Sequence, residues 1–388
     1  MPVPLRYSMS DIALAASPTA TPLAAWLASG EIHPETTVYR GVITPQELDA
    51  RQTETEALVF GAAVHDMGWL RRVQVKGSDR FRWLSGMVTN AVNELAGNGG
   101  AWNLVLNAQG RIQGELSVWR SGPQTYGSGP GSQAGSDDDT LEMEIAADQQ
   151  EKLLTHFDKF IIMDDVELTP RGGETALGLT GPKAGEVLAR LGLPVLRDPM
   201  THARAEFNGM SLRIRREYGV LGEHYVIWTS LHSMPKMWKF LMTGGALPVG
   251  VAAVESFRVA EGIPLYGVDM LERDLPQETS QMRTLHFSKG CYLGQEIVER
   301  IRSRGNVHRH LRQIEIDGPL PASGTELKLD GAAVGNVTSA AELPLPRGTR
   351  RVALAMVRGE AEAKQQPLGY ETGEGAGTAR MVASTPAV

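Results

Sequence analysis

The residues of this 388-residue chain that are best suited to chemistry lie together in the segment Lys289-Gly290-Cys291-Tyr292-Leu293-Gly294-Gln295-Glu296. The segment holds the only cysteine of the chain, between two glycines and close to a lysine and a glutamate. A thiol acts as a nucleophile or metal ligand in its thiolate form, which a nearby ammonium favours, and glycines let a backbone approach a ligand closely. The segment therefore predicts a reactive Cys291 assisted by Lys289, and the alternative is a loop with an incidental cysteine.

Composition limits the other classes of function. One cysteine excludes an internal disulfide and a multi-cysteine metal cage, and a net charge of −7 argues against general nucleic-acid binding. His308 and His310 lack a third ligand nearby, so we expect no metal site there. No secretory signal and no apolar stretch of about 18 residues is found, so we expect a cytoplasmic protein without a membrane span.

The length of the chain predicts two or three domains, and the hydrophobic pattern predicts a mixed α+β protein. Strands are expected at 70–75, 102–106, 112–119, 141–145, 176–179, 212–216, 224–228, 311–316, 326–329, 333–337 and 352–357. Helices are expected at about 79–88, 147–157, 182–191, 235–242 and 251–261. The order strand–helix–strand–strand–helix occurs twice, which favours two antiparallel sheet units, and the last strands suit a small β-barrel. Residues 121–139, rich in Gly, Ser and Asp, are expected to form a mobile loop.

The sequence Lys-Gly-Cys-Tyr-Leu-Gly-Gln-Glu resembles the signature of the YgfZ group, within the family of folate-binding proteins related to the T-protein of the glycine cleavage system. Three further segments, 75–90, 218–225 and 255–267, are similar to family segments and follow in the family's order. Together the four segments cover roughly residues 65–312. Only the cysteine-containing segment is specific by itself.

The resemblance implies an α+β fold with two mixed ferredoxin-like, antiparallel sheet-and-helix units plus a small C-terminal β-barrel. The three domains would form a T-protein-like cloverleaf around a central folate cleft. The expected boundaries are an N-terminal extension at 1–55, a first folate-binding domain at 56–170 completed by 245–300, a second α+β domain at 171–244, a barrel at 301–372 and a flexible tail at 373–388.

The resemblance also implies tetrahydrofolate, or a folate derivative, as the cofactor. It assigns contacts with this ligand to five residues: Glu223, Arg258, Tyr266, Gln295 and Glu296. Glu223 would accept hydrogen bonds from the pterin, and Arg258 would bind a carboxylate of the glutamate tail or the pterin carbonyl. From the residues alone, Glu223 could instead be an exposed turn residue and Arg258 an ion-pair partner of Glu255 or Glu261.

T-proteins carry an Asp-Asp pair where this chain has Gly114 and Glu115, so aminomethyl transfer to tetrahydrofolate is the second hypothesis. The first is a YgfZ-like, monomeric tetrahydrofolate-binding protein that supports assembly or repair of iron–sulfur enzymes, with those enzymes or their assembly factors as partners. Cys291 would then be a nucleophile, a redox relay or a cluster ligand. A third possibility is a scaffold without folate affinity.

Arg300, Arg302 and Arg304 alternate with other residues, so they share one face if the segment is extended. Such a stripe could bind a polyglutamate folate tail or an acidic partner protein. A solvated strand face is the alternative.

Overall fold

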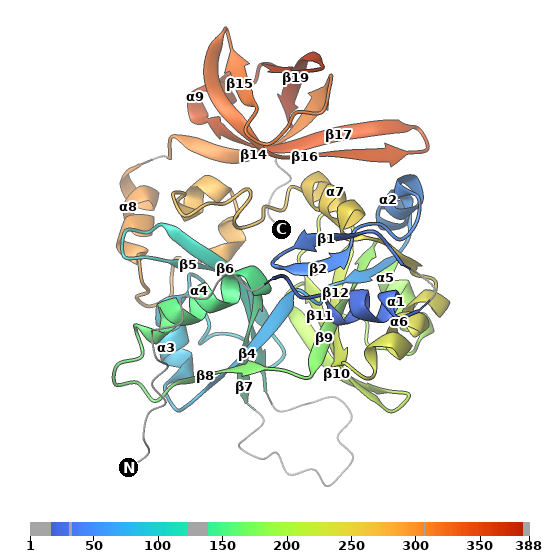
Figure 1. Cartoon of the computed structure of the whole chain (residues 1–388). Coiled ribbons are helices and arrows are strands. Elements are labelled where there is room, and N and C mark those ends of the chain that lie inside the picture. Colours follow the sequence, from blue (N-terminus) through green and yellow to red (C-terminus); the bar gives the residue numbers. More distant parts are fainter. Residues whose placement is uncertain (1–16, 31–32, 123–138, 306, 383–388) are drawn as a thin grey trace.

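The structure is a computed structural model that describes residues 17–30, 33–122, 139–305 and 307–382. Two sheet-and-helix units lie next to each other, and a β-barrel lies across one end of both (Figure 1). This confirms the mixed α+β content and the small C-terminal barrel. Most of the expected loop at 121–139 is outside the described residues.

The first sheet has the strand order β5-β6-β7-β4-β8, and the described strands pair antiparallel throughout. Its strands are β4 (Leu70–Lys76), β5 (Gly100–Leu106), β6 (Ile112–Ser121), β7 (Thr140–Ala146) and β8 (Glu167–Arg171). Helices α3 (Arg80–Met87) and α4 (Ala147–Asp158) bury apolar side chains on one face, among them Leu84 and Phe157. All but β8 were predicted at these positions, since their periods are regular.

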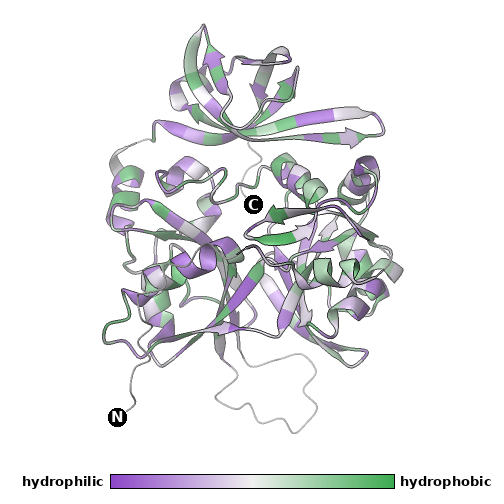
Figure 2. Ribbon diagram, in the orientation of Figure 1, coloured by the Kyte–Doolittle hydropathy of each residue, from purple (hydrophilic) through white to green (hydrophobic). Residues whose placement is uncertain are grey.

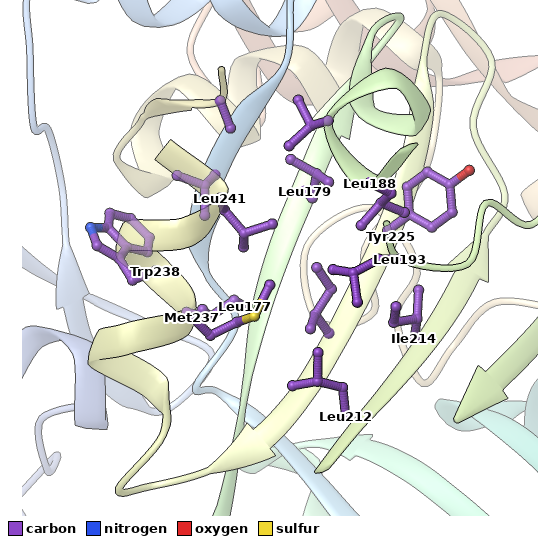
Figure 3. Close-up of a cluster of buried hydrophobic side chains, with 14 of the residues drawn as sticks. Leu177, Leu179, Leu188, Leu193, Leu212, Ile214, Tyr225, Met237, Trp238 and Leu241 are labelled. Atoms are coloured by element: carbon purple, nitrogen blue, oxygen red, sulfur yellow. The ribbon is translucent and has the colours of Figure 1, made fainter. Parts of the chain in front are cut away.

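The second sheet has the order β10-β11-β12-β9-β3-β13. Its strands are β3 (Ala63–Asp66), β9 (Glu174–Gly181), β10 (Thr201–Phe207), β11 (Met210–Glu217), β12 (Glu223–Ser230) and β13 (Leu247–Pro248). One face is covered by α1 (Pro22–Ala28), α5 (Ala184–Arg190) and α6 (Met234–Thr243). Figure 3 shows Met237, Trp238 and Leu241 of α6 next to Leu177 of β9 in this core.

The two sheets turn their other faces toward each other, and strand alternation makes those faces polar. On β7, Leu141 and Met143 enter the helix-covered core, whereas Glu142 and Glu144 point to the second sheet and meet Arg215 of β11. Hydrophilic and hydrophobic residues accordingly mix along the strands in Figure 2. The space between the sheets is therefore lined by charged and aromatic side chains.

The expectation of an N-terminal extension at 1–55 is wrong for the described residues 17–30 and 33–55. They form α1, the hairpin of β1 (Thr36–Tyr39) and β2 (Val42–Pro45), and the start of α2 (Arg51–Phe60). Leu23 is buried in the second core, and the hydroxyls of Thr21 and Thr44 donate to Asp66. These elements are too short to show a clear period. Residues 63–66 likewise join the second sheet, although the first domain was expected to begin at 56.

A closed barrel of six strands lies beyond the two sheets in the described chain. Its strands are β14 (Arg309–Asp317), β15 (Glu326–Leu329), β16 (Ala332–Leu345), β17 (Gly348–Arg358), β18 (Leu368–Thr372) and β19 (Gly375–Met381), with α9 (Gly359–Lys364) between β17 and β18. The expected flexible tail is therefore wrong for residues 373–382, because β19 pairs with β14 and β18. Its small residues fit the barrel, since a Cβ at Gly377 would overlap the ring of Tyr370.

Residues 295–304 form α8 (Gln295–Arg304), so the expected extended stripe of arginines is wrong. Successive helix residues turn by about 100°, which places Arg300 and Arg302 on different sides. Arg302 instead lies over the ring of Phe287 and near Glu299. In the described part of the chain, no helix is long and apolar enough to cross a membrane.

Candidate functional site

A cavity of about 250 Å³ lies between the inner faces of the two sheets, closed on the barrel side by α7 (Val251–Glu261) and residues 263–265. Aromatic side chains form much of its wall: Tyr39, Trp69, Trp102, Tyr218 and Tyr225. Six acidic residues also line it: Asp66, Glu115, Glu144, Glu217, Glu255 and Glu261. An aromatic wall with several carboxyl groups suits a flat, hydrogen-bond-donating ligand.

Glu217 differs from the other five acidic residues of the cavity. Each of those accepts hydrogen bonds from protein groups, as Glu144 does from Trp119 Nε1 at 2.8 Å. Within the described residues, no hydrogen bond or ion pair within 4.0 Å engages the Glu217 carboxyl. Burial, with the nearby Glu144 second, raises its pKa to about 8. At neutral pH this carboxyl is mostly protonated and free to bind a ligand.

Glu115 lies in another part of the cavity wall, on β6. Its carboxylate accepts hydrogen bonds from Trp102 Nε1 at 3.2 Å and from the Tyr266 backbone N–H at 3.0 Å, and Arg40 Nη2 is 3.8 Å away. Burial nonetheless raises its pKa. The preceding Gly114 faces α4, where a Cβ would meet Gln149 and Leu153. Of the two residues at the family's Asp-Asp position, only Glu115 lines the cavity.

A chain of hydrogen-bonding groups crosses the wall formed by β3, β9 and β12. His65 Nε2 is 3.0 Å from Thr180 Oγ1, which is 3.4 Å from His224 Nδ1. His224 Nε2 lies 2.7 Å from Glu261, whose other oxygen accepts two backbone N–H groups. Burial lowers the pKa of His65 to about 4, so His65 is neutral at physiological pH.

Arg258 is the sequence-predicted ligand contact that the structure places in the cavity wall. Its guanidinium donates to both oxygens of Glu255, at 3.0 and 3.1 Å, and to Asp269 at 2.7 Å. Burial would lower its pKa, but Glu255 and Asp269 outweigh that effect and raise it. The ion pair with Glu255, considered as the alternative from the sequence, is therefore present.

The other predicted ligand contacts are not among the residues that line the cavity. Glu223 accepts hydrogen bonds from the Gly185 N–H at 2.7 Å and from Arg216 at 2.9 Å. The Tyr266 hydroxyl is 2.6 Å from Lys152 Nζ, and this residue reaches Glu115 through its backbone. Gln295 and Glu296 begin α8.

The cysteine segment also lies outside the cavity lining. Cys291 is exposed. Lys289 is buried, and its ammonium donates to the backbone carbonyls of Ser85, Val88 and Asn90 at 2.6–2.7 Å. Burial lowers the pKa of Lys289 to about 7. In the charged form its three N–H groups are engaged with carbonyls at and just beyond the end of α3. The predicted chemical role of Cys291 and Lys289 stays a prediction.

Sequence reasoning missed Glu217, although a signal for it was present. Leu212 and Ile214 are apolar, and Arg213, Arg215 and Glu217 alternate with them. The alternation places Glu217 on the inner, polar face of β11. The pattern does not show which strands form the cavity wall opposite β11. In the structure they include β6 and β7. Among the described residues, no group of three or more His, Cys, Asp or Glu side chains could hold a metal ion.

The fold is that of a T-protein-type aminomethyltransferase. The glycine cleavage system aminomethyltransferase T from Bartonella henselae superposes with a TM-score of 0.79 over 96% of this chain and 98% of that one, at 17% identity. Residues 28–289 match the GCVT N-terminal domain family, and this chain belongs to that family.

Curated relatives agree with this assignment. The aminomethyltransferase of Halalkalibacterium halodurans is 24% identical over 83% of this chain and 86% of its own length. That of Geobacillus kaustophilus is 25% identical over 85% of this chain and 88% of its own length. A chloroplastic protein of Arabidopsis thaliana, named a putative transferase, is 22% identical over 76% of this chain, which spans 65% of that relative's length.

Proposed function

We propose that this protein binds tetrahydrofolate, with the pterin head group in the cavity between the two sheets. The observation that carries the proposal is the Glu217 carboxyl, which lines an aromatic cavity and has no partner among the described residues. A pterin presents an amino group and a ring N–H side by side, and a carboxylate can accept a hydrogen bond from each. The family of the chain supports the same ligand class.

The cavity is large enough for the pterin head group but not for the whole ligand. Its volume of about 250 Å³ is slightly below the roughly 300–1,000 Å³ typical of pockets that enclose a whole small molecule. It therefore suits the bicyclic head group, with the rest of the ligand extending outward. Trp69, Trp102 and Tyr218 line the cavity and give it aromatic surface that a flat group can contact. When bound, tetrahydrofolate would supply a nitrogen able to carry a one-carbon unit.

Calorimetric titration with tetrahydrofolate tests the proposal. We expect binding by the wild type and about 10- to 100-fold weaker binding by Glu217→Gln, because the amide can accept only one of the two hydrogen bonds and turns an N–H toward the other donor. Glu206→Gln, at an exposed position of the neighbouring strand β10 that does not line the cavity, is the matched control and should bind as the wild type does. Equal affinity of all three proteins would overturn the role of Glu217, and no binding by any of them would overturn the function.

Within this function, we propose the YgfZ-like role in assembly or repair of iron–sulfur enzymes, exercised in the cytoplasm, with Cys291 as the reactive residue. The exposure of Cys291 supports access by a partner protein. Cys291→Ala should then fail to restore iron–sulfur enzyme activity in a strain lacking this protein, although it binds tetrahydrofolate normally. Full restoration by Cys291→Ala would remove this role and leave folate binding intact.

Aminomethyl transfer is the second candidate, favoured by the position of Glu115 in the cavity wall and by the named activity of the relatives. Glu115 could hold a proton near the ligand, because burial raises its pKa. It is already bound by Trp102 and Tyr266, however, and is one methylene longer than the family's aspartate. A reconstituted glycine-cleavage assay should therefore show very low turnover, and turnover equal to that of an authentic T-protein would make this candidate the function.

A further inference from the structure

Arg283 lies in the cavity wall next to two aromatic rings and without an acidic partner among the described residues. It follows Met282 in the short 3-10 helix η3 (Met282–Thr284), and its guanidinium carbon lies 4.7 Å from the ring centre of Tyr218 and 5.3 Å from that of Trp102. All three residues line the cavity and are partly exposed, whereas His65 and Asp66 are buried. Trp102, Tyr218 and Arg283 therefore belong to the partly exposed part of the cavity wall, as Glu217 does.

Arg283 lacks the acidic partner that the other arginines of the cavity have. Arg40 lies within 4.0 Å of Glu115 and Asp148, and Arg258 pairs with Glu255 and Asp269. Arg283 donates from Nε and Nη2 to the neutral side-chain amide oxygen of Gln281, at 3.1 and 2.8 Å. In the described part of the chain, no carboxylate lies within ion-pair distance of it. Arg283 is thus a cation in the cavity wall without an ion-pair partner among the described residues.

The position of this cation is set by the fold. The backbone carbonyl of Arg283 accepts a hydrogen bond from Asn90 Nδ2 at 2.9 Å, and that of Thr284 accepts one from Thr89 Oγ1 at 2.6 Å. Gln281 and the two rings then hold the guanidinium. The charge is partly desolvated, because burial lowers the pKa of Arg283, with Tyr218 and Glu261 acting in the opposite direction. A bound anion would offset this cost.

We propose that Arg283 determines specificity for a ligand that carries a carboxylate on the part that leaves the cavity. The class of ligand is a flat heteroaromatic head group linked through an aromatic amide to an acidic amino acid. This inference rests on the proposed function and names the group that binds the acidic tail of the folate. A guanidinium with free N–H groups can bind a carboxylate through two hydrogen bonds, and the Trp102 and Tyr218 rings can flank the aromatic linker.

Matched ligands test this inference. Binding of tetrahydrofolate is compared by calorimetry with that of its analogue in which both glutamyl carboxylates are primary amides, so that size and head group are unchanged. The wild type should bind the acid about 10- to 100-fold more tightly than the diamide, as expected for a charge-assisted hydrogen-bonded pair. The difference should shrink as salt is raised.

The variants assign this preference to one residue. Arg283→Gln should bind both ligands with the affinity that the wild type has for the diamide, and Arg283→Lys, which keeps the charge, should retain part of the preference. Arg273→Gln, an exposed arginine that is not among the lining residues, is the control and should keep the preference fully. Equal weakening of both ligands in Arg283→Gln, or a preference that survives it, would overturn the inference while leaving folate binding in place. No binding of either ligand to the wild type would overturn both proposals.

Discussion

At the scale of single residues, polar side chains that could bind a ligand differ from those that stabilise the fold. The former lack an ion-pair partner among the described residues of the protein, and the latter have their hydrogen bonds made by other groups of the chain. Glu217 and Arg283 line the cavity and meet no group of opposite charge within ion-pair distance in the described structure. Lys289, which the sequence placed beside the reactive cysteine, donates instead to three carbonyls at 2.6–2.7 Å. This contrast directs functional tests to Glu217 and Arg283 and stability tests to Lys289.

Lys289→Ala should destabilise the protein by at least about 2 kcal/mol, because it leaves buried carbonyls at the end of α3 without their donor. Chemical unfolding measures this, and Glu296→Ala, an exposed neighbour, should stay within about 0.5 kcal/mol of the wild type. The pKa of Lys289 is lowered to about 7, so above this pH the native state holds fewer protons than the unfolded state. Its titration should therefore raise stability as pH increases from about 7 to about 10.5. A stable Lys289→Ala protein would mean that the carbonyls find other donors.

At the scale of elements, the two sheets are joined by charged strand faces. Glu142 of β7 binds Arg72 of β4 and Arg215 of β11, with 2.6 Å between its oxygen and Arg215 Nη2. Burial would raise the pKa of Glu142, but Arg215, Arg72 and Arg213 lower it to about 2. The network links β7 to β11, and its member Glu144 also lines the cavity.

Glu142→Gln should therefore cost about 3–5 kcal/mol of unfolding free energy, since it leaves buried arginines without their anion. In the wild type the contribution of Glu142 is fully present above the unfolded pKa of about 4.5 and is lost as pH falls toward 2. Urea titrations between pH 2 and 7 measure both effects, with Glu151→Gln on the exposed side of α4 as the control. An acid dependence as steep in Glu142→Gln as in the wild type would show that other carboxylates carry it.

Most strands and helices could be predicted because period-2 and helical patterns are properties of short segments. The strands at 70–75 and 112–119 and the helix at 251–261 are such cases. Elements that form only because of partners distant in the sequence could not be predicted in this way. Strand β19 is rich in Ala and Gly and exists because β14 and β18 flank it. The arginines of 300–304 were considered for an extended segment, whereas the segment forms α8. The same limit applies to the site. Arg258 could be predicted from its own segment, whereas predicting Glu217 requires knowing which sheet faces β11.

At the scale of the whole molecule, one buried carboxylate joins the barrel to the cavity wall. Asp269 accepts hydrogen bonds from Thr338 and Ser339 of β16, both at 2.6 Å, from Arg258 of α7 at 2.7 Å, and from the Leu265 N–H at 3.0 Å. Arg258 also donates to Ser339 at 3.3 Å. Because Arg258 and Leu265 line the cavity, the barrel helps to fix the shape of the site.

Asp269→Ala should lower stability by about 3–5 kcal/mol, because a buried arginine and several donors lose their acceptor together. It should also loosen the barrel from the rest of the chain, seen as reduced hydrogen-exchange protection in 263–270 and in β16. Asp317→Ala, an exposed aspartate of the same barrel, is the control. Unchanged exchange in both segments would mean that apolar packing between α7 and β16 is sufficient.

If Glu217 receives the head group of tetrahydrofolate, its proton must leave on binding, and the number of protons released can be measured. Free Glu217 has a pKa of about 8, and a ligand with two donors favours its ionised form. Affinity should therefore rise with pH up to about 8 and then level off. Calorimetric titrations at pH 7 in buffers of different ionisation enthalpy should show release of nearly one proton per tetrahydrofolate bound to the wild type and none for Glu217→Gln. Absence of binding, or binding with no proton released by the wild type, would contradict the account.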